Sequence, residues 1–206
     1  MRLFRNIGRA FSLAIGIYAV FFAVQTLRPR TLALTLPADV KPGDVVLMRS
    51  HTWRAELVRL IDGVRYRDGF SHVGIVAVRS VDGTWDIIHA VPGADGTVRR
   101  EAWASIARGG GISEAVIYRA EINSAEQAAL LTLLDDYAAR AVPFDGGFDH
   151  TDDRTLYCTE LVTTAYAQAG HPIVDDKILA GRAIFPGHLA GSDRLRRVGT
   201  TRVPAR

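Results

Sequence analysis

The order of predicted elements favours an α+β fold. Candidate strands fill most of the first half of the chain's body, and the two strongest candidate helices follow them. Such a separation of strands from helices is typical of α+β domains. The turn signal Asp82-Gly83 between two apolar runs predicts a β-hairpin, so neighbouring strands of the sheet are expected to be antiparallel. A chain of 206 residues can bury one substantial core.

The candidate strands are short apolar runs bounded by turn residues. They cover residues 44–48, 71–78, 85–91, 97–100 and 115–121. Apolar residues at helical spacing predict helices over residues 52–61, 101–107, 124–138 and from about 156 to 169. Ser124 with Gln127 three residues later matches a capping box, and Thr155 is the expected N-cap of the last helix.

The first 30 residues predict a membrane anchor or signal segment. Residues 10–27 are uncharged, arginines flank the run on both sides, and a helix of this length just crosses a bilayer core. No Ala-x-Ala cleavage site follows Val24, which favours a retained anchor over a cleaved secretory signal. The arginines that bracket the run argue against the other alternative, a buried core helix. More positive charge precedes the run than follows it. This bias predicts an extracytoplasmic, periplasmic body.

The net charge of +3 hides an uneven distribution. Residues 1–30 carry +5 and residues 193–206 carry +4, so the remainder of the chain carries −6. An acidic body argues against nucleic acid as a partner, whereas basic ends suit anionic lipid. We expect residues 193–206 to form a basic, loose tail.

Cys158 is the only cysteine of the chain and lies in the first turn of a predicted amphipathic helix. Free N–H groups and the helix dipole stabilise a thiolate at this position and lower its pKa. A thiol nucleophile also needs a base, and usually a third group that orients the base. His72 and His89 lie on the two strands of the predicted hairpin, ten and seven residues from Asp82, and so fall loosely opposite each other.

Other roles for these three residues stay open at this point. A lone cysteine is often only a small buried apolar residue, and a buried histidine is often only hydrogen-bonded. His72, His89 and Cys158 could also bind zinc, although they include no closely spaced ligand pair. Asp145, in a loop with three further aspartates, does not match the calcium-loop spacing. We assign no cofactor.

Several motifs together resemble the circularly permuted papain-like cysteine hydrolases, the YiiX-like branch of the NlpC superfamily. The motifs are Gly43-Asp44-Val45-Val46, Ser71-His72-Val73-Gly74-Ile75, Ile88-His89-Ala90, Phe144-Asp145-x-x-Phe148 and Tyr157-Cys158-Thr159-Glu160-Leu161-Val162. The resemblance covers residues 39–192 and has the permuted order, with histidine before cysteine. It implies a small antiparallel sheet packed against helices, with the cysteine at a helix start that faces the sheet.

By the same resemblance Cys158 is the nucleophile, His72 is the base and His89 fills the third polar position. Many YiiX-like chains have a glutamate at that third position, and serine often stands where this chain has Thr159. We therefore expect a thiol-dependent hydrolase that cleaves an amide bond, in a peptide or cell-wall peptide, through an acyl-enzyme. The alternatives are a lipid or ester acyl hydrolase or acyltransferase, and an anchored binding domain without turnover.

Overall fold

The structure is a computed structural model that describes residues 34–50, 69–79, 83–93, 95–109, 111–148, 154–175 and 183–203. Residues 33–206 form one compact unit. The predicted anchor over residues 1–30 and the predicted helix over residues 52–61 lie outside the described residues. Among the residues that are described, no helix is long and apolar enough to cross a membrane.

One six-stranded sheet in the order β4-β3-β2-β1-β5-β6 forms the centre of this unit, and all of its neighbouring strands are antiparallel. The strands are β1 (Val45–Ser50), β2 (His72–Arg79), β3 (Trp85–Ala90), β4 (Val98–Ala102), β5 (Ile112–Arg119) and β6 (Arg196–Arg202). The β-branched and aliphatic side chains of β1 are buried on both faces, as expected of a strand in the middle of a covered sheet. The predicted α+β class is confirmed.

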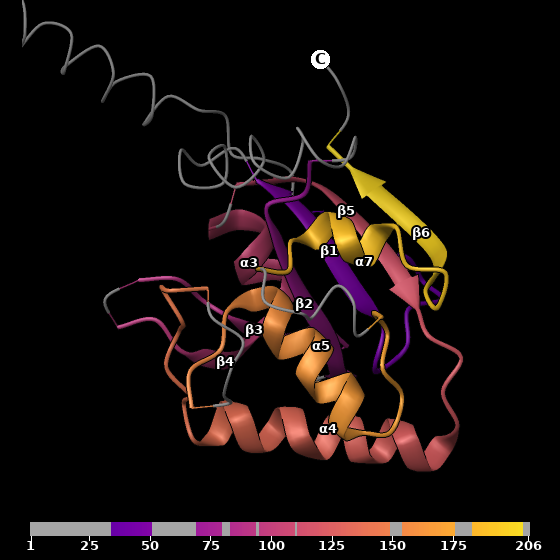
Figure 1. Ribbon diagram of the computed structural model, residues 1–206. Helices are drawn as coiled ribbons and strands as arrows, with labels where there is room; N and C mark the ends of the chain where they lie inside the picture. Colours follow the sequence, from indigo (N-terminus) through magenta and orange to yellow (C-terminus); the bar gives the residue numbers. More distant parts are fainter. Residues whose placement is uncertain are drawn as a thin grey trace, which may run out of the picture. The chain divides into compact units, whose positions relative to one another are not determined.

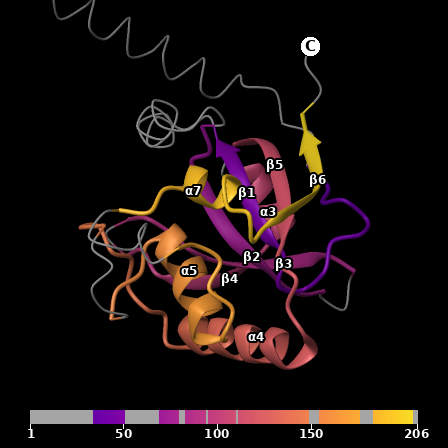
Figure 2. The same cartoon turned by 45° about the vertical axis from the view of Figure 1, so that its right-hand side comes forward.

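Helices cover both faces of the sheet (Figure 1). They are α3 (Trp103–Gly109), α4 (Ser124–Ala139), α5 (Cys158–Gln168) and the short α7 (Pro186–Ala190). The core side chains of α4 and α5 pack on one face, together with alternate strand residues such as Val45 and Ile75. The intervening strand residues, such as Val46 and Val76, pack with α3 on the other face. Figure 2 shows α5 and α4 together on their side of the sheet.

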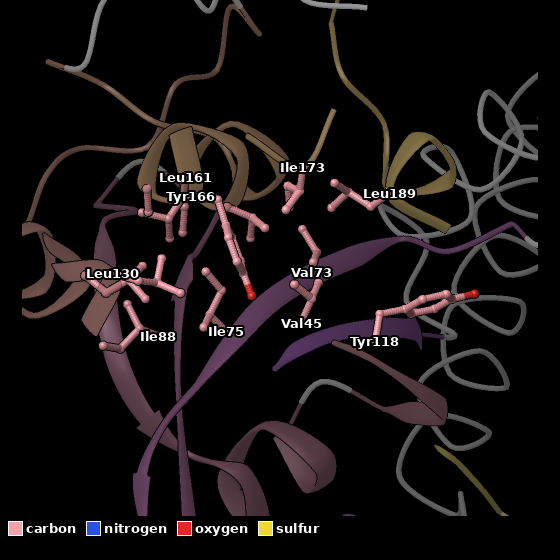
Figure 3. Packing of buried hydrophobic residues seen from close by; sticks show 14 of the residues in the cluster. Val45, Val73, Ile75, Ile88, Tyr118, Leu130, Leu161, Tyr166, Ile173 and Leu189 are labelled. Atoms are coloured by element: carbon pink, nitrogen blue, oxygen red, sulfur yellow. The ribbon is translucent and has the colours of Figure 1, made fainter. Parts of the chain in front are cut away.

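The first of these two cores positions α5 (Figure 3). Leu161 and Tyr166 project from α5 towards Val73, Ile75 and Ile88 of the sheet. Leu161, Val73, Ile75 and Ile88 are fully buried, and Tyr166 is 1% exposed. Burial of several large side chains, each worth about 1.5–3 kcal/mol, fixes α5 across the central strands.

Three local predictions were wrong. Residues 196–202 are not a loose tail, because they pair with β5 as the edge strand β6 and carry the sheet beyond Ser192. Asn123, not Ser124, caps α4: its side chain accepts hydrogen bonds from the N–H groups of Ala125 and Glu126, and Glu126 accepts one from the N–H of Asn123. The predicted helix over residues 101–107 begins only at Trp103, because β4 continues to Ala102.

A buried ion pair joins the start of β1 to the end of β5. Asp44 is 2% exposed, and its carboxylate accepts two hydrogen bonds of 2.7 Å from Arg119 and one of 2.8 Å from the N–H of Lys41. Next to it, the hydroxyl of Tyr166 on α5 donates to the carbonyl of Gly43 at 2.5 Å. These contacts connect the helix that carries Cys158 to the central strand.

We predict that Arg119→Ala lowers the free energy of unfolding by about 3–5 kcal/mol, because it leaves the Asp44 carboxylate buried and unpaired. Chemical denaturation measures the loss. Asp136→Ala is the control, since it breaks an exposed pair with Arg140 and is expected to cost about 0.5 kcal/mol or less. Equal, small losses in both variants would contradict the structural role of the Asp44–Arg119 pair.

Candidate active site

Cys158 is the first residue of α5. The N-cap is Tyr157, in extended conformation, and its N–H donates to the carboxylate of Glu160 at 3.2 Å. Thr155 was therefore wrong as the N-cap, and the helix starts two residues later than that cap implies. As a result the thiol lies at the very N-terminus of the helix, where backbone N–H groups are free of intrahelical partners.

The thiol of Cys158 lies against the start of β2. Its Sγ atom lies 3.8 Å from Oγ1 of Thr159, and the backbone N–H groups of Val73 and Thr159 act on the thiol. β2 pairs with β1 from His72 onwards, but it pairs with β3 only from Ile75 onwards. Val73 therefore lies before the part of β2 that pairs with β3. The β2 residue whose backbone N–H acts on the thiol, Val73, directly follows His72.

Burial raises the pKa of the Cys158 thiol, and the hydrogen bonds from Thr159, Val73 and its own N–H lower it by less. The sequence predicted a lowered pKa from the helix N-terminus, and this expectation was wrong. The helix end does favour the thiolate, but the loss of water around the sulfur outweighs it. At rest and near neutral pH the group is a thiol.

His72 and His89 are hydrogen-bonded, with 2.8 Å between Nε2 of His72 and Nδ1 of His89. Because Ile75 pairs with Ile88, His89 lies opposite Gly74, and His72 is its diagonal neighbour. The predicted hairpin does bring the two histidines together, although not directly opposite each other. A Cβ atom at Gly74 would lie 3.1 Å from the Cβ of His89, so glycine provides the room for this approach.

Glu101 on β4 extends this polar row, and the sequence analysis did not identify it. Its pairing with Ile87 places its Oε2 atom 3.4 Å from Nε2 of His89. The same oxygen accepts a hydrogen bond of 3.1 Å from Nε of Arg99. The sequence analysis ended this strand at residue 100 and placed Glu101 at the start of a helix, whereas β4 continues to Ala102.

Burial lowers the pKa of both imidazoles. The pKa of His72 falls to about 3, through desolvation first and the neighbouring His89 second, while Glu101 raises it. The pKa of His89 falls to about 4, through desolvation and then the charge of Arg99. Both rings are therefore neutral near pH 7. Nε2 of His72 is hydrogen-bonded to His89. Nδ1 is therefore the ring nitrogen of His72 that remains for proton exchange with a thiol.

An aromatic cluster adjoins the nucleophile candidate. The ring of Phe148 is 43% exposed and packs against Phe144 and Tyr157, with centroids 6.2 and 5.4 Å away. Tyr157 itself is buried, and its hydroxyl accepts a hydrogen bond of 2.8 Å from the N–H of Ile184. Phe148 thus provides an exposed apolar surface next to the residue that precedes Cys158.

Among the residues that the structure describes, no group of three histidine, cysteine, aspartate or glutamate side chains is placed to hold a metal ion. His72, His89 and Cys158 do not form such a group. The zinc interpretation of these three residues therefore has no support from their arrangement.

The fold and the motif order define a permuted papain-like protein. Residues 39–198 match the model of the family described as permuted papain-like amidase enzyme, YaeF/YiiX, C92 family, and the chain belongs to this family. Its fold is similar to the crystal structure of metalloprotein yiiX from Escherichia coli O157:H7, with a TM-score of 0.60 and 17% identity over 77% of this chain and 96% of that one. No curated protein matches.

We predict that Gly74→Ala costs about 1–3 kcal/mol of stability, because the new methyl group would lie 2.5 Å from the side chain of Ile87 and 3.1 Å from the carbonyl oxygen of Ile88. Gly109→Ala, at the end of α3, is the matched control, since nothing lies within 4 Å of its Cβ position. Thermal or chemical denaturation of both variants measures the difference. A Gly74→Ala protein as stable as the Gly109→Ala protein would contradict the close contact between β2 and β3.

The buried imidazoles also predict a pH dependence of stability. The pKa values of His72 and His89 are about 3 and about 4 in the folded chain and about 6.5 in the unfolded chain. Between the folded and the unfolded pKa values, the unfolded chain binds more protons than the folded chain. The free energy of unfolding should therefore fall as pH drops from about 6.5 towards 4, by up to about 1.4 kcal/mol per pH unit for each imidazole. Urea denaturation at pH 7, 6 and 5 measures the slope. His89→Gln should reduce it, and an unchanged slope would count against a buried neutral His89.

Proposed function

We propose that this chain is a cysteine hydrolase that cleaves an amide bond through an acyl-enzyme. Cys158 is the nucleophile, His72 is the general base and acid, and His89 orients His72. The observation that carries the proposal is the hydrogen bond between His72 and His89 at the start of β2, a strand against which α5 packs and whose Val73 N–H acts on the thiol of Cys158.

In the first half-reaction, Nδ1 of His72 takes the proton of the thiol as the sulfur attacks the substrate carbonyl carbon. A C–S bond forms and the carbonyl π electrons move to oxygen. When this intermediate collapses, the C–N bond breaks and His72 returns the proton to the departing amine. The product is a thioester on Cys158.

In the second half-reaction, water attacks the thioester and gives its proton to Nδ1 of His72. The C–S bond breaks, the carboxylic acid leaves, and the sulfur recovers the proton. Backbone N–H groups near the start of α5 stabilise the oxyanion that forms in both steps, and the N–H of Cys158 is the candidate donor. Tyr157 has a packing role, in line with its burial and its bond to Ile184.

The substrate that we propose is a peptide, with a cell-wall peptide as the first choice. The family description as amidase supports the amide bond. A lipid or other acyl ester, with transfer of the acyl group as a variant, is the second candidate. The exposed ring of Phe148 beside Tyr157 favours it, because an acyl chain needs an apolar surface near the nucleophile.

We further propose that residues 1–30 hold the body at a membrane, on its extracytoplasmic side. The uncharged run with flanking arginines supports this. Fractionation of the full chain, and of a chain that begins at residue 31, measures it. Recovery of both chains in the same fraction would contradict an anchor.

The alkylation rate of Cys158 between pH 5 and 9 tests the thiol–imidazole pair, and the single cysteine makes the label specific. We expect His72→Ala to lower the rate below pH ~8.5, the ordinary pKa of a free thiol, by about tenfold or more. His171→Ala, outside the site, is the control and should label like the parent. Identical profiles for the parent and His72→Ala would remove the catalytic pair, and a binding domain without turnover would then become the better hypothesis.

Turnover is measured with matched amide and ester substrates that carry the same acyl group. Cys158→Ser and His72→Ala should each lose at least about a hundredfold in kcat. Mass spectrometry of the quenched protein should find the acyl group on Cys158. The ratio of amide to ester hydrolysis decides between the two substrate classes.

A further inference from the structure

The row of polar groups does not end at His89. Its Nε2 atom is buried and has no hydrogen-bond partner among the described residues, although the carboxylate of Glu101 lies only 3.4 Å away. Glu101 also raises the pKa of His72. Catalytic hydrogen bonds are often long in free enzymes and tighten when the substrate is bound.

The contact between the two histidines permits two tautomers. In the first, Nε2–H of His72 donates to Nδ1 of His89, so the proton of His89 is on its Nε2, the nitrogen that lies 3.4 Å from the carboxylate of Glu101. Nδ1 of His72 then has a lone pair and can accept the proton of a thiol.

In the second tautomer, Nδ1–H of His89 donates to Nε2 of His72. The proton of His72 is then on Nδ1, where it blocks proton acceptance. The lone pair on Nε2 of His89 would face the carboxylate of Glu101, which is electrostatically unfavourable. The negative charge of Glu101 therefore favours the first tautomer.

We propose that Glu101 is a positioning residue that fixes the tautomer of His89 and, through it, the tautomer of His72. This deepens the proposed function and rests on it, since the lone pair on Nδ1 serves catalysis only if Cys158 is the nucleophile. No proton moves to Glu101. It remains a carboxylate while His72 cycles between imidazole and imidazolium.

Arg99 opposes Glu101 in this role. Its guanidinium group lies beside Glu101, with Nη2 2.9 Å from Oε2, and its charge lowers the pKa of His89. Among the described residues, the charged or titratable groups that act on His89 are His72 from β2 and Arg99 and Glu101 from β4. Arg99 thus reduces the effect of Glu101 on the imidazoles.

The first readout is the tautomer itself, measured by ¹⁵N NMR of the imidazole nitrogens, with His72→Gln and His89→Gln used for assignment. In the parent chain at pH 7 we expect protonated Nε2 and unprotonated Nδ1 on both rings. In Glu101→Gln the second tautomer should become populated, because the amide can either accept from or donate to Nε2 of His89. Asp135→Asn, which removes an exposed carboxylate next to Arg100, is the charge-matched control and should keep the parent pattern.

The second readout is kinetic. Glu101→Gln should lower kcat and the alkylation rate of Cys158 by about tenfold without a change in KM. Glu101→Asp, which keeps the charge, should recover part of the loss. Arg99→Gln should act in the opposite direction and move the acid limb of the pH profile to higher pH, because it removes the cation that lowers the pKa of His89.

The two proposals fail differently. Parent-like nitrogen shifts and kinetics in Glu101→Gln would overturn the role of Glu101, and the proposed function would stand if His72→Ala and Cys158→Ser still lost activity. A parent chain in which Nδ1 of His72 is protonated would overturn the inference directly. If the expected tautomers are found but His72→Ala labels like the parent, the structural inference holds and the proposed function fails.

Discussion

The packing of α5 across the central strands is the constraint on which the candidate site depends. Leu161 and Val162 are fully buried against the sheet, and the hydroxyl of Tyr166 donates to the carbonyl of Gly43 at the start of β1. With the far part of the helix fixed in this way, its first residue cannot slide along β2. The thiol of Cys158 therefore stays close enough to β2 for the backbone N–H of Val73 to lower its pKa.

The histidines place polar groups in the same region, and the free-energy cost of burying them must be offset by the packing of the sheet. His89 is 4% exposed, so its ring lies in the interior, where it contacts His72. Such a group is tolerated because a neutral imidazole can share a hydrogen bond with His72, and because Gly74 leaves room for the close approach.

Both edge strands, β4 and β6, carry several arginines, and such charged edges also discourage pairing with another chain.

Local patterns were sufficient to predict the helix that begins near Cys158 and the hairpin that joins His72 to His89. Apolar spacing and Asp-Gly turn chemistry act over a few residues, so the sequence shows them directly. β6 was missed because Arg196–Arg202 has almost no apolar pattern, and it becomes a strand only by pairing with β5. Glu101 was missed for a similar reason, since its approach to His89 follows from the pairing of β4 with β3. The raised pKa of the thiol depends on burial by several distant segments.

Burial raises the pKa of the thiol and lowers the pKa of His72 to about 3, so both partners are neutral at rest. In the proposed mechanism, transfer of a proton from Cys158 to His72 leaves the net charge of the site unchanged, and the two opposite charges form at the start of α5 and at the start of β2. Each charge alone would be costly in this environment, but their attraction offsets part of that cost. In the same proposal, the N–H groups at the start of α5 stabilise the negative partner, and Glu101 stabilises the positive one through His89. A pair that is neutral at rest would ionise during attack on an electrophile rather than before it, so in this proposal the reactivity of the thiol depends on His72 rather than on a preformed thiolate.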